Sequence, residues 1–263
     1  MKTKKNYESI DEIICDYLDK KQANVRRQRA KESYWSASGL GKCKRYQYFI
    51  RKETEATNNT PYKWKNNAED GRASHIWRQA AIKLMVKESW FEGEIVDKEA
   101  CFKGHYDIVV RLNDGLALCD IKTQNNKRFR KRALLPDKID PLHKRQLGAY
   151  FLFLKKSQFP DLANARIYYI NRDTGEREEI IVEFDDEYLA DIKNEIKYLN
   201  NCWLKDMLPQ REVSMNCASF CEFYDTCYNS RRFSSEIHEK SQRENSGVPQ
   251  LPALRKQKVS SNR

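Results

Sequence analysis

Apolar side chains recur at intervals of three and four residues along several stretches of the chain, a spacing that places them on one face of a helix. The stretches that show it best are residues 7–30, 68–90, 141–156 and 185–208. A shorter helix is predicted around Cys43, where Ser36 or Ser38 can cap its start. The pattern therefore predicts helices over much of the chain.

Between these helices, apolar runs rich in β-branched residues are interrupted by turn residues, which is the pattern of strands. One run covers residues 94–102, and two more form a predicted hairpin over residues 104–124. Another hairpin is predicted over residues 165–184. Strands that alternate with helices predict an α/β chain with a mixed β-sheet flanked by helices.

Length and composition allow a globular protein with a sizeable core. The chain has 263 residues, of which 40% are hydrophobic and 33% are charged, so it can bury a core and keep a very polar surface. Its formal net charge is +11, which favours a polyanionic partner such as a nucleic acid. A basic surface also serves solubility, so charge alone does not identify the partner.

Nothing in the sequence is typical of secretion or membrane insertion. The first ten residues lack the apolar core of a signal peptide, and no apolar run approaches the roughly 18 residues that a membrane span needs. We therefore expect a cytoplasmic protein without a membrane partner. In that reducing environment the eight cysteines are expected to bind metal or to be buried, and not to form disulfides.

Shifts in composition divide the chain into four predicted regions. Residues 1–67 form an N-terminal helical region that ends in a polar loop at residues 58–67, and residues 68–210 form the core. Residues 211–230 hold a cluster of cysteines. Residues 231–263, with eight Lys or Arg and three Glu, are expected to be a disordered basic tail.

The hairpin of residues 104–124 carries charged side chains that can form a metal site. Asp120 and Lys122 are two residues apart on one strand, so they project to the same face, and Asp107 on the neighbouring strand lies near them if the register allows. Two acids beside an ammonium are a candidate site for a divalent cation. The alternative is a set of strand-end acids with a lysine as their salt-bridge partner. Unpaired charges on an apolar strand cost several kcal/mol, which favours a site.

Two of the predicted helices carry further candidates. His75 lies in the helix of residues 68–90, while Gln146 and Tyr150, four residues apart, share a face of the helix of residues 141–156. Each has an ordinary alternative, since a single helical histidine is usually a surface or core residue. In the ordinary alternative for Gln146 and Tyr150, the two residues lie on a packed helix face and the phenol of Tyr150 is buried. Their joint occurrence in one order favours a functional role.

These motifs together resemble those of a known nuclease family. A helical histidine in GRASH is followed by GHYD, then by DIKT, and then by QLGAY, over residues 71–150. This arrangement resembles the RecB-like branch of the PD-(D/E)XK nuclease superfamily, in particular its Cas4-like and phage exonuclease group. The resemblance implies a restriction-endonuclease-like core, in which a mixed β-sheet is flanked by helices.

The resemblance also implies a role for each candidate residue. The ligands of Mg²⁺ or Mn²⁺ would be His75, Asp107, Asp120 and the backbone carbonyl of Ile121. Lys122 would serve the nucleophile, while Gln146 and Tyr150 would shape the DNA side of the site. The implied reaction is hydrolysis of a phosphodiester bond by in-line attack of an activated water.

Cysteines from both ends of the chain form a second candidate site. Cys217, Cys221 and Cys227 follow one another at short spacing, and Cys43 can supply a fourth thiolate. Four thiolates suit Zn²⁺ or an iron–sulfur cluster, and the spacing does not choose between them. The resemblance implies a [4Fe-4S] cluster that joins the N- and C-terminal segments, with Zn²⁺ as the alternative. Three residues, where the family usually has two, separate Cys217 from Cys221.

A basic segment, predicted to be a loop, directly follows the second strand of the hairpin and would lie at the mouth of the site. Residues 125–145 contain eight Lys or Arg against two Asp. The expected nucleic-acid contacts are Lys127, Arg128, Phe129, Arg130 and Arg132. Phosphate contacts with one stacking ring suit single-stranded DNA bound without sequence preference, whereas the alternative is a solvated loop.

From these features we expect a Mg²⁺- or Mn²⁺-dependent DNA exonuclease that acts on single-stranded DNA or DNA ends, in recombination, repair or CRISPR-type DNA processing. Its partners could include recombination, helicase or CRISPR-adaptation proteins. It would act in the cytoplasm of a bacterial cell or, if it is phage-encoded, of the host. The alternative is a catalytically silent DNA-binding or adaptor protein that keeps the fold and the cluster.

Overall fold

The computed structural model describes residues 9–31, 34–58, 62–212, 217 and 221–229. The chain divides into two compact units, residues 1–223 and residues 224–263. Of the second unit, the structure describes one helix, α8 (Tyr224–Asn229), in which the rings of Tyr224 and Tyr228 lie 4.3 Å apart. The remaining elements belong to the first unit. The predicted disordered tail, residues 231–263, lies outside the described residues.

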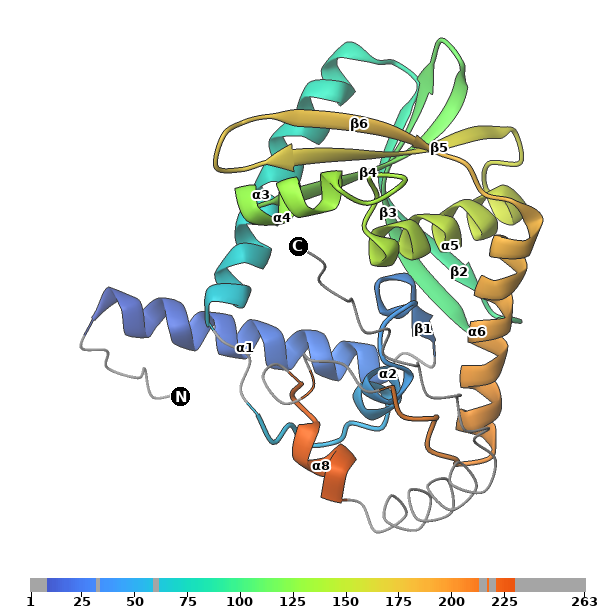
Figure 1. Ribbon diagram of the computed structural model, residues 1–263. Helices are drawn as coiled ribbons and strands as arrows, with labels where there is room; N and C mark the ends of the chain where they lie inside the picture. The colour runs from blue at the N-terminus through green and yellow to red at the C-terminus, as the bar shows by residue number, and fades with distance from the viewer. Residues whose placement is uncertain (1–8, 32–33, 59–61, 213–216, 218–220, 230–263) are drawn as a thin grey trace, which may run out of the picture. The chain divides into compact units, whose positions relative to one another are not determined.

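A six-stranded mixed sheet forms the centre of the first unit (Figure 1). Its strands are β1 (Trp35–Ser36), β2 (Ser89–Asp97), β3 (Phe102–Leu112), β4 (Gly115–Gln124), β5 (Leu162–Asn171) and β6 (Arg177–Val182). β3 pairs antiparallel with β2 and β4 and parallel with β1, while β5 pairs parallel with β4 and antiparallel with β6. The predicted α/β chain with a mixed sheet is therefore confirmed, and β1 comes from the predicted N-terminal helical region.

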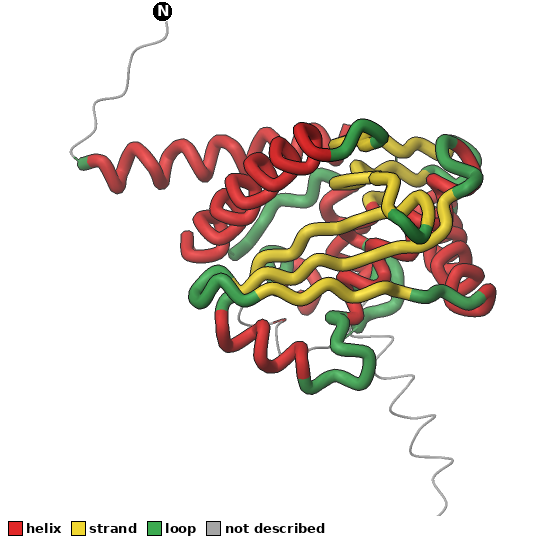
Figure 2. The backbone as a smooth tube through the Cα atoms, turned by 90° about the horizontal axis from the view of Figure 1, so that it is seen from above, coloured by secondary structure: helices red, strands yellow, loops and turns green. Residues whose placement is uncertain are grey.

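Helices cover both faces of this sheet (Figure 2). The helices of the first unit are α1 (Ile10–Lys31), the short 3-10 helix η1 (Ala37–Gly39), α2 (Lys44–Arg51), α3 (Tyr62–Met85), α4 (Asn126–Ala133), α5 (Pro141–Ser157) and α6 (Asp186–Leu204). On one face, Ile82 of α3 packs against a cluster that includes Ile108 and Ile121. On the other face, Phe153 of α5 stacks on Phe102 with ring centroids 4.2 Å apart. None of the helices in the described part of the chain is long and apolar enough to cross a membrane.

The predicted hairpin of residues 104–124 is confirmed as β3 and β4. Their antiparallel pairing runs from Ile108 and Cys119 to Leu112 and Gly115. Gly115 has a φ of 121°, a value that a residue with a Cβ adopts only with strain, so the turn requires glycine at this position.

The strand predicted at residues 94–102 is displaced toward the N-terminus. β2 ends at Asp97, and Phe102 already belongs to β3. The chain turns between them because Asp97 Oδ1 accepts a hydrogen bond from the backbone N–H of Ala100 at 2.8 Å, and Cys101 has a left-handed φ of 52°. A side-chain hydrogen bond, which periodicity does not record, therefore separates the two strands.

Two segments that were predicted as loops are helical. α3 begins within the polar stretch of residues 58–67, where Lys65 forms an ion pair with Asp19 of α1. The basic segment after β4 forms α4, whose cap Asn125 accepts a hydrogen bond from the Arg128 backbone at 2.9 Å. A cap and a contact between helices, rather than an apolar period, stabilise these helical turns.

The apolar positions that predicted α1 and α3 lie mostly outside the core. On α1, Ile10 and Tyr17 are exposed, whereas Leu18 is buried. On α3, Trp77 and Met85 are exposed. Periodicity located both helices, but it did not identify the side of each helix that packs.

Candidate active site

The pairing of β3 with its neighbours is interrupted at Asp107. β2 and β3 pair on both sides of Glu92 and Asp107, but these two residues do not pair with each other. Pairing of β3 with β4 begins at the next residue, Ile108. The Asp107 carboxylate instead accepts a hydrogen bond from the backbone N–H of Ile121 on β4, at 2.9 Å. The opening in the ladder therefore brings the Asp107 carboxylate to β4.

Asp120 and Lys122 project to the same face of β4, because side chains two apart on a strand share a face. The Lys122 Nζ lies 2.8 Å from Asp120 Oδ2, and the Asp120 side chain is only 1% exposed. Although the two charges are close, neither Asp120 oxygen accepts a well-directed hydrogen bond from the described residues. A buried carboxylate whose oxygens accept no hydrogen bond from the protein is suited to bind a cation.

A chain of hydrogen bonds connects Lys122 to α5. Its Nζ donates to Oε1 of Gln146 at 3.1 Å, and Nε2 of Gln146 donates to the hydroxyl of Tyr150 at 2.9 Å. The Tyr150 ring packs directly on Gly104 of β3, where a Cβ would lie 2.6 Å from Cε1 of the ring. The glycine of the Gly-x-x-Asp motif therefore provides the space that this tyrosine occupies.

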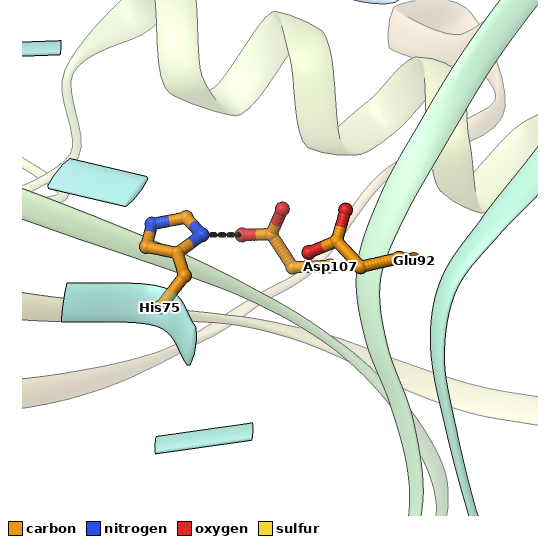
Figure 3. Close-up of side chains that lie close together, drawn as sticks. All are labelled: His75, Glu92 and Asp107. Atoms are coloured by element: carbon orange, nitrogen blue, oxygen red, sulfur yellow. Dashed lines mark ion pairs between the residues drawn. The ribbon is translucent and has the colours of Figure 1, made fainter. Parts of the chain in front are cut away.

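His75 reaches the site from α3, and Glu92 reaches it from β2 (Figure 3). The His75 Nδ1 lies 3.5 Å from Asp107 Oδ2. One ligand atom each of His75, Glu92 and Asp107 lies within 4.8 Å of the other two, a spacing that suits one metal ion. Sequence reasoning missed Glu92, because a single acid in a strand belongs to no motif and its contacts depend on strand pairing.

Burial controls the protonation of the metal-binding candidates. Burial, followed by the charge of Asp120, raises the pKa of Asp107 to about 8. Burial and the charge of Lys122 lower the pKa of His75 below its ordinary value. At neutral pH His75 is therefore neutral, which is the form that binds metal, whereas Asp107 holds a proton that a cation must displace.

Lys122 and Tyr150 keep their protons at neutral pH. Burial alone would lower the pKa of Lys122, but the negative charges of Asp120 and Asp107 outweigh burial and raise it above the ordinary value. Burial and the charge of Asp120 raise the pKa of Tyr150 to about 12. The site therefore presents an ammonium and a phenol as hydrogen-bond donors beside two carboxyl groups.

The predicted nucleic-acid contacts on α4 differ in their exposure. Lys127 and Arg128 are exposed, and Arg130 forms an ion pair with Glu176 through two hydrogen bonds. Phe129 is 2% exposed. Its ring therefore offers no surface to a base, contrary to the predicted stacking role.

Arg132 also faces the interior, contrary to its predicted contact with DNA. It is 3% exposed and donates to the backbone carbonyl of Lys138 and, at 2.7 Å, to Glu178. Its guanidinium lies 4.0 Å from the ring centroid of Tyr169. These contacts make Arg132 part of the packing between α4 and the sheet.

A cavity of about 390 Å³ adjoins the candidate site at Tyr150. Its lining includes Lys42, Arg51 and Lys103, and the described residues that line it include no acid. Gln47, which is 8% exposed, also lines it, and neither polar atom of its amide has a hydrogen-bond partner in the described part of the chain. Basic groups with an unused amide suit a ligand that carries a phosphate.

Three of the four cysteines predicted to hold a cluster lie in the first unit, and Cys227 lies in the second. Cys43 immediately precedes α2. The backbone carbonyl of Cys221 accepts a hydrogen bond from Nδ2 of Asn58 at 3.1 Å. Among the described residues of the first unit, the cysteines form no group at the spacing of a single metal ion.

Aromatic contacts bring the two ends of the first unit together near these cysteines. Phe223 packs on Tyr46 and Phe49 of α2, with ring centroids 5.5 and 5.4 Å apart respectively. The backbone N–H of Thr57 donates to the carbonyl of Glu222 at 2.8 Å. Segments far apart in the sequence therefore meet beside α2.

Known proteins resemble this chain in sequence pattern and in structure. A model of the PD-(D/E)XK nuclease superfamily matches residues 6–228. Among solved structures, the protein SSO0001 matches with 18% identity and a TM-score of 0.48, over 80% of this chain and 94% of that chain. The alkaline exonuclease LHK-Exo from Laribacter hongkongensis matches with 14% identity and a TM-score of 0.42, over 82% of this chain and 96% of that chain. Among curated proteins, none matches the sequence.

Proposed function

Because the chain belongs to the PD-(D/E)XK nuclease superfamily, we propose that it is a DNA exonuclease of the RecB-like, Cas4-like type that depends on a divalent metal. Its substrates would be single-stranded DNA or DNA ends, in the cytoplasm, during recombination, repair or CRISPR-type DNA processing. The observation that carries this proposal is the meeting of Asp107, Asp120 and Lys122 where the β3–β4 ladder opens.

The acids and the histidine of the site fit a cation such as Mg²⁺ or Mn²⁺. The proposed ligands are His75, Asp107, Asp120 and the backbone carbonyl of Ile121. Two observations support the fit. Ligand atoms of His75 and Asp107 lie within 4.8 Å of each other, and the buried Asp120 oxygens accept no hydrogen bond from the described residues. When bound, the cation polarises the phosphodiester and lowers the pKa of a water molecule.

Lys122 would orient the attacking water and stabilise negative charge that develops on the phosphate. Because the nearby carboxylates raise its pKa, Lys122 remains an ammonium and cannot act as the general base. Its hydrogen bond to Gln146 fixes the direction of the Nζ group. Lys122 thus acts as a positioned positive charge, which is the electrostatic form of catalysis.

Tyr150 and the basic cavity beside it would receive the DNA strand. The Tyr150 hydroxyl accepts a hydrogen bond from Gln146 and keeps its own proton to donate. The cavity supplies Lys42 and Lys103 for phosphate contacts, and Lys127 on α4 remains a proposed contact. Contacts of this kind neutralise the backbone without reading a base sequence.

The proposed enzyme also carries a structural [4Fe-4S] cluster, with Zn²⁺ as the alternative. The proposed ligands are Cys43, Cys217, Cys221 and Cys227. Support comes from the donor type and from the packing of Phe223 on α2, which brings the neighbourhoods of Cys43 and Cys221 together.

The assigned site is tested by cutting of labelled single-stranded DNA in Mn²⁺ or in chelator. We expect wild-type protein to cut only with the metal. Asp120→Asn and Lys122→Ala should each lower the rate by roughly 10²- to 10³-fold, because each removes a fixed charge from the site. Asp137→Asn is the matched control, since Asp137 forms its ion pair with Lys144 at the surface.

Two outcomes would contradict the proposal in different ways. Equal cutting by wild type and by Asp120→Asn would show that the site has been assigned to the wrong residues. A wild-type protein that binds DNA but does not cut it with any divalent metal would instead be the catalytically silent adaptor.

A further inference from the structure

Glu92 adopts a backbone conformation that strands avoid. Its φ is 48°, in the left-handed region, although it lies inside β2. The β2–β3 ladder lacks the pair that Glu92 would form with Asp107. The next residue is Gly93, where a Cβ would lie 2.3 Å from the Tyr106 ring. Strained residues that are not glycine gather at functional sites, so the Glu92 side chain is a candidate reason for this strain.

The strand order places Glu92 and Asp120 on opposite sides of Asp107. β3 lies between β2 and β4 in the sheet, so Glu92 approaches Asp107 from β2 while Asp120 approaches it from β4. His75 of α3 has its Nδ1 3.5 Å from Asp107 Oδ2, and Figure 3 shows Asp107 between His75 and Glu92. Glu92 therefore approaches Asp107 from a strand that supplies none of the ligands proposed above.

The spacing of His75, Glu92 and Asp107 fits one small cation. One ligand atom from each of these residues lies within 4.8 Å of the others. Ligands of Mg²⁺ lie about 2.1 Å from the ion, so two opposite ligands are about 4.2 Å apart. Small side-chain shifts therefore bring all three atoms into one coordination sphere.

Gln79 of α3 holds Glu92 in place without neutralising it. Its Nε2 donates to Oε1 of Glu92 and, at 3.3 Å, to the backbone carbonyl of Asp107. The ammonium of Lys122 is paired with Asp120 on the other side of β3. Among the described residues, no Lys or Arg forms an ion pair with Glu92, and its exposed side chain is accessible to a cation from solution.

We propose that Glu92, which approaches from the β2 side of Asp107, is a further ligand of the divalent cation of the Mg²⁺ and Mn²⁺ class that His75 and Asp107 hold. Gln79 is the residue that positions Glu92. This site rests on the proposed function in one respect, which is that His75 and Asp107 are metal ligands. In the ordinary alternative, Glu92 is a surface acid whose only role is to accept a hydrogen bond from Gln79.

Titration of the full-length, chelator-stripped protein with Mn²⁺ by isothermal calorimetry tests the site. Glu92→Gln should raise the Kd for Mn²⁺ by about tenfold or more, because a charged ligand is lost. The matched control is Glu94→Gln, two residues along the same strand, where Glu94 pairs with Lys103 at 3.0 Å. The control should leave the Kd unchanged. Equal Mn²⁺ binding by Glu92→Gln and wild type, or equal weakening by both variants, would overturn the proposal.

Thermal unfolding with and without Mn²⁺ separates ligation from folding. The substituted amide oxygen can still accept the hydrogen bond from Gln79, so metal-free Glu92→Gln should be as stable as wild type. Mn²⁺ should raise the Tm of wild type more than that of the variant, since ligands stabilise the state that binds them. A metal-free variant that has lost its fold would make Glu92 a structural residue and contradict the proposal.

The nuclease assay distinguishes this inference from the proposed function. If wild type cuts DNA while Glu92→Gln binds Mn²⁺ normally, the Glu92 site is wrong and the proposed function stands. If the three residues bind Mn²⁺ but wild type never cuts DNA, the metal site stands and the proposed function is wrong.

Discussion

Asp107 gives the metal-free protein a pH dependence that its neighbours do not share. An aspartic acid in an unfolded chain titrates near pH 4, whereas burial raises the pKa of Asp107 to about 8 in the folded state. Between these values the folded state holds the additional proton, so stability falls as pH rises. Burial lowers the pKa of His75 and of His143, which has the opposite effect, but only below about pH 6.5. The window from about pH 6.5 to 8 therefore isolates Asp107.

We expect the free energy of unfolding of the metal-free protein to fall between about pH 6.5 and 8, and Asp107→Asn to remove this slope. Urea titrations in chelator at several pH values measure it. The Mn²⁺ affinity of wild type should rise over the same window, because the cation then competes with fewer protons. A wild-type stability that is constant across the window would contradict the raised pKa.

Substitution by alanine should lower the stability of the protein at Gly104 and raise it at Gly71. At Gly104 a Cβ would lie 2.6 Å from Cε1 of Tyr150 and 3.3 Å from Cβ of Ala37, so Gly104→Ala should destabilise the protein by about 1–3 kcal/mol. At Gly71, inside α3, the nearest atom is Oγ1 of Thr123 at 3.4 Å. Gly71→Ala should therefore stabilise by about 0.5–1 kcal/mol through helix propensity. Denaturant unfolding measures both, and a neutral Gly104→Ala would show that Tyr150 has room to move.

At the scale of the element, α4 combines packing and exposed charge on one short helix. Arg132→Ala should destabilise the protein by about 2–4 kcal/mol, because it leaves Glu178 and the Lys138 carbonyl without a buried donor. Lys127→Ala, on the exposed side, should change stability by less than about 0.5 kcal/mol. Thermal unfolding of the two variants checks this contrast. An Arg132→Ala protein of normal stability and weakened DNA binding would favour the DNA contact predicted for Arg132.

Local sequence patterns predicted the elements better than the surfaces they bury. Turn residues and alternation located the β3–β4 hairpin. The helix predicted over residues 185–208 is α6, whose cap Asp185 accepts a hydrogen bond from the Tyr188 backbone at 2.7 Å. The start of α3 and the whole of α4 were missed, since an ion pair and an asparagine cap stabilise them. Helices that depend on such contacts show little periodic spacing of apolar residues in their sequence.

At the scale of the whole molecule, the proposed cluster would join two ends of the chain. Purified under anaerobic conditions, wild type should contain iron and absorb visible light. Cys43→Ser and Cys221→Ser should each lose most of the iron, because each removes a proposed ligand. Cys101→Ser is the control, since its thiol lies 3.7 Å from the Lys98 carbonyl and is not a proposed ligand. A colourless, iron-free protein loaded with zinc would rule out the cluster and support the Zn²⁺ alternative.

The sequence by itself determined the α/β class, the hairpin of residues 104–124 and the order of the residues from His75 to Tyr150. These features follow from periodicity, turn residues and spacing, which are local properties of the chain. Only the tertiary structure decided that Glu92 joins His75 and Asp107, and that Phe129 and Arg132 face the interior. Those placements depend on where the β2–β3 ladder opens and on how α4 packs on the sheet, so they arise from contacts between segments that are distant in sequence.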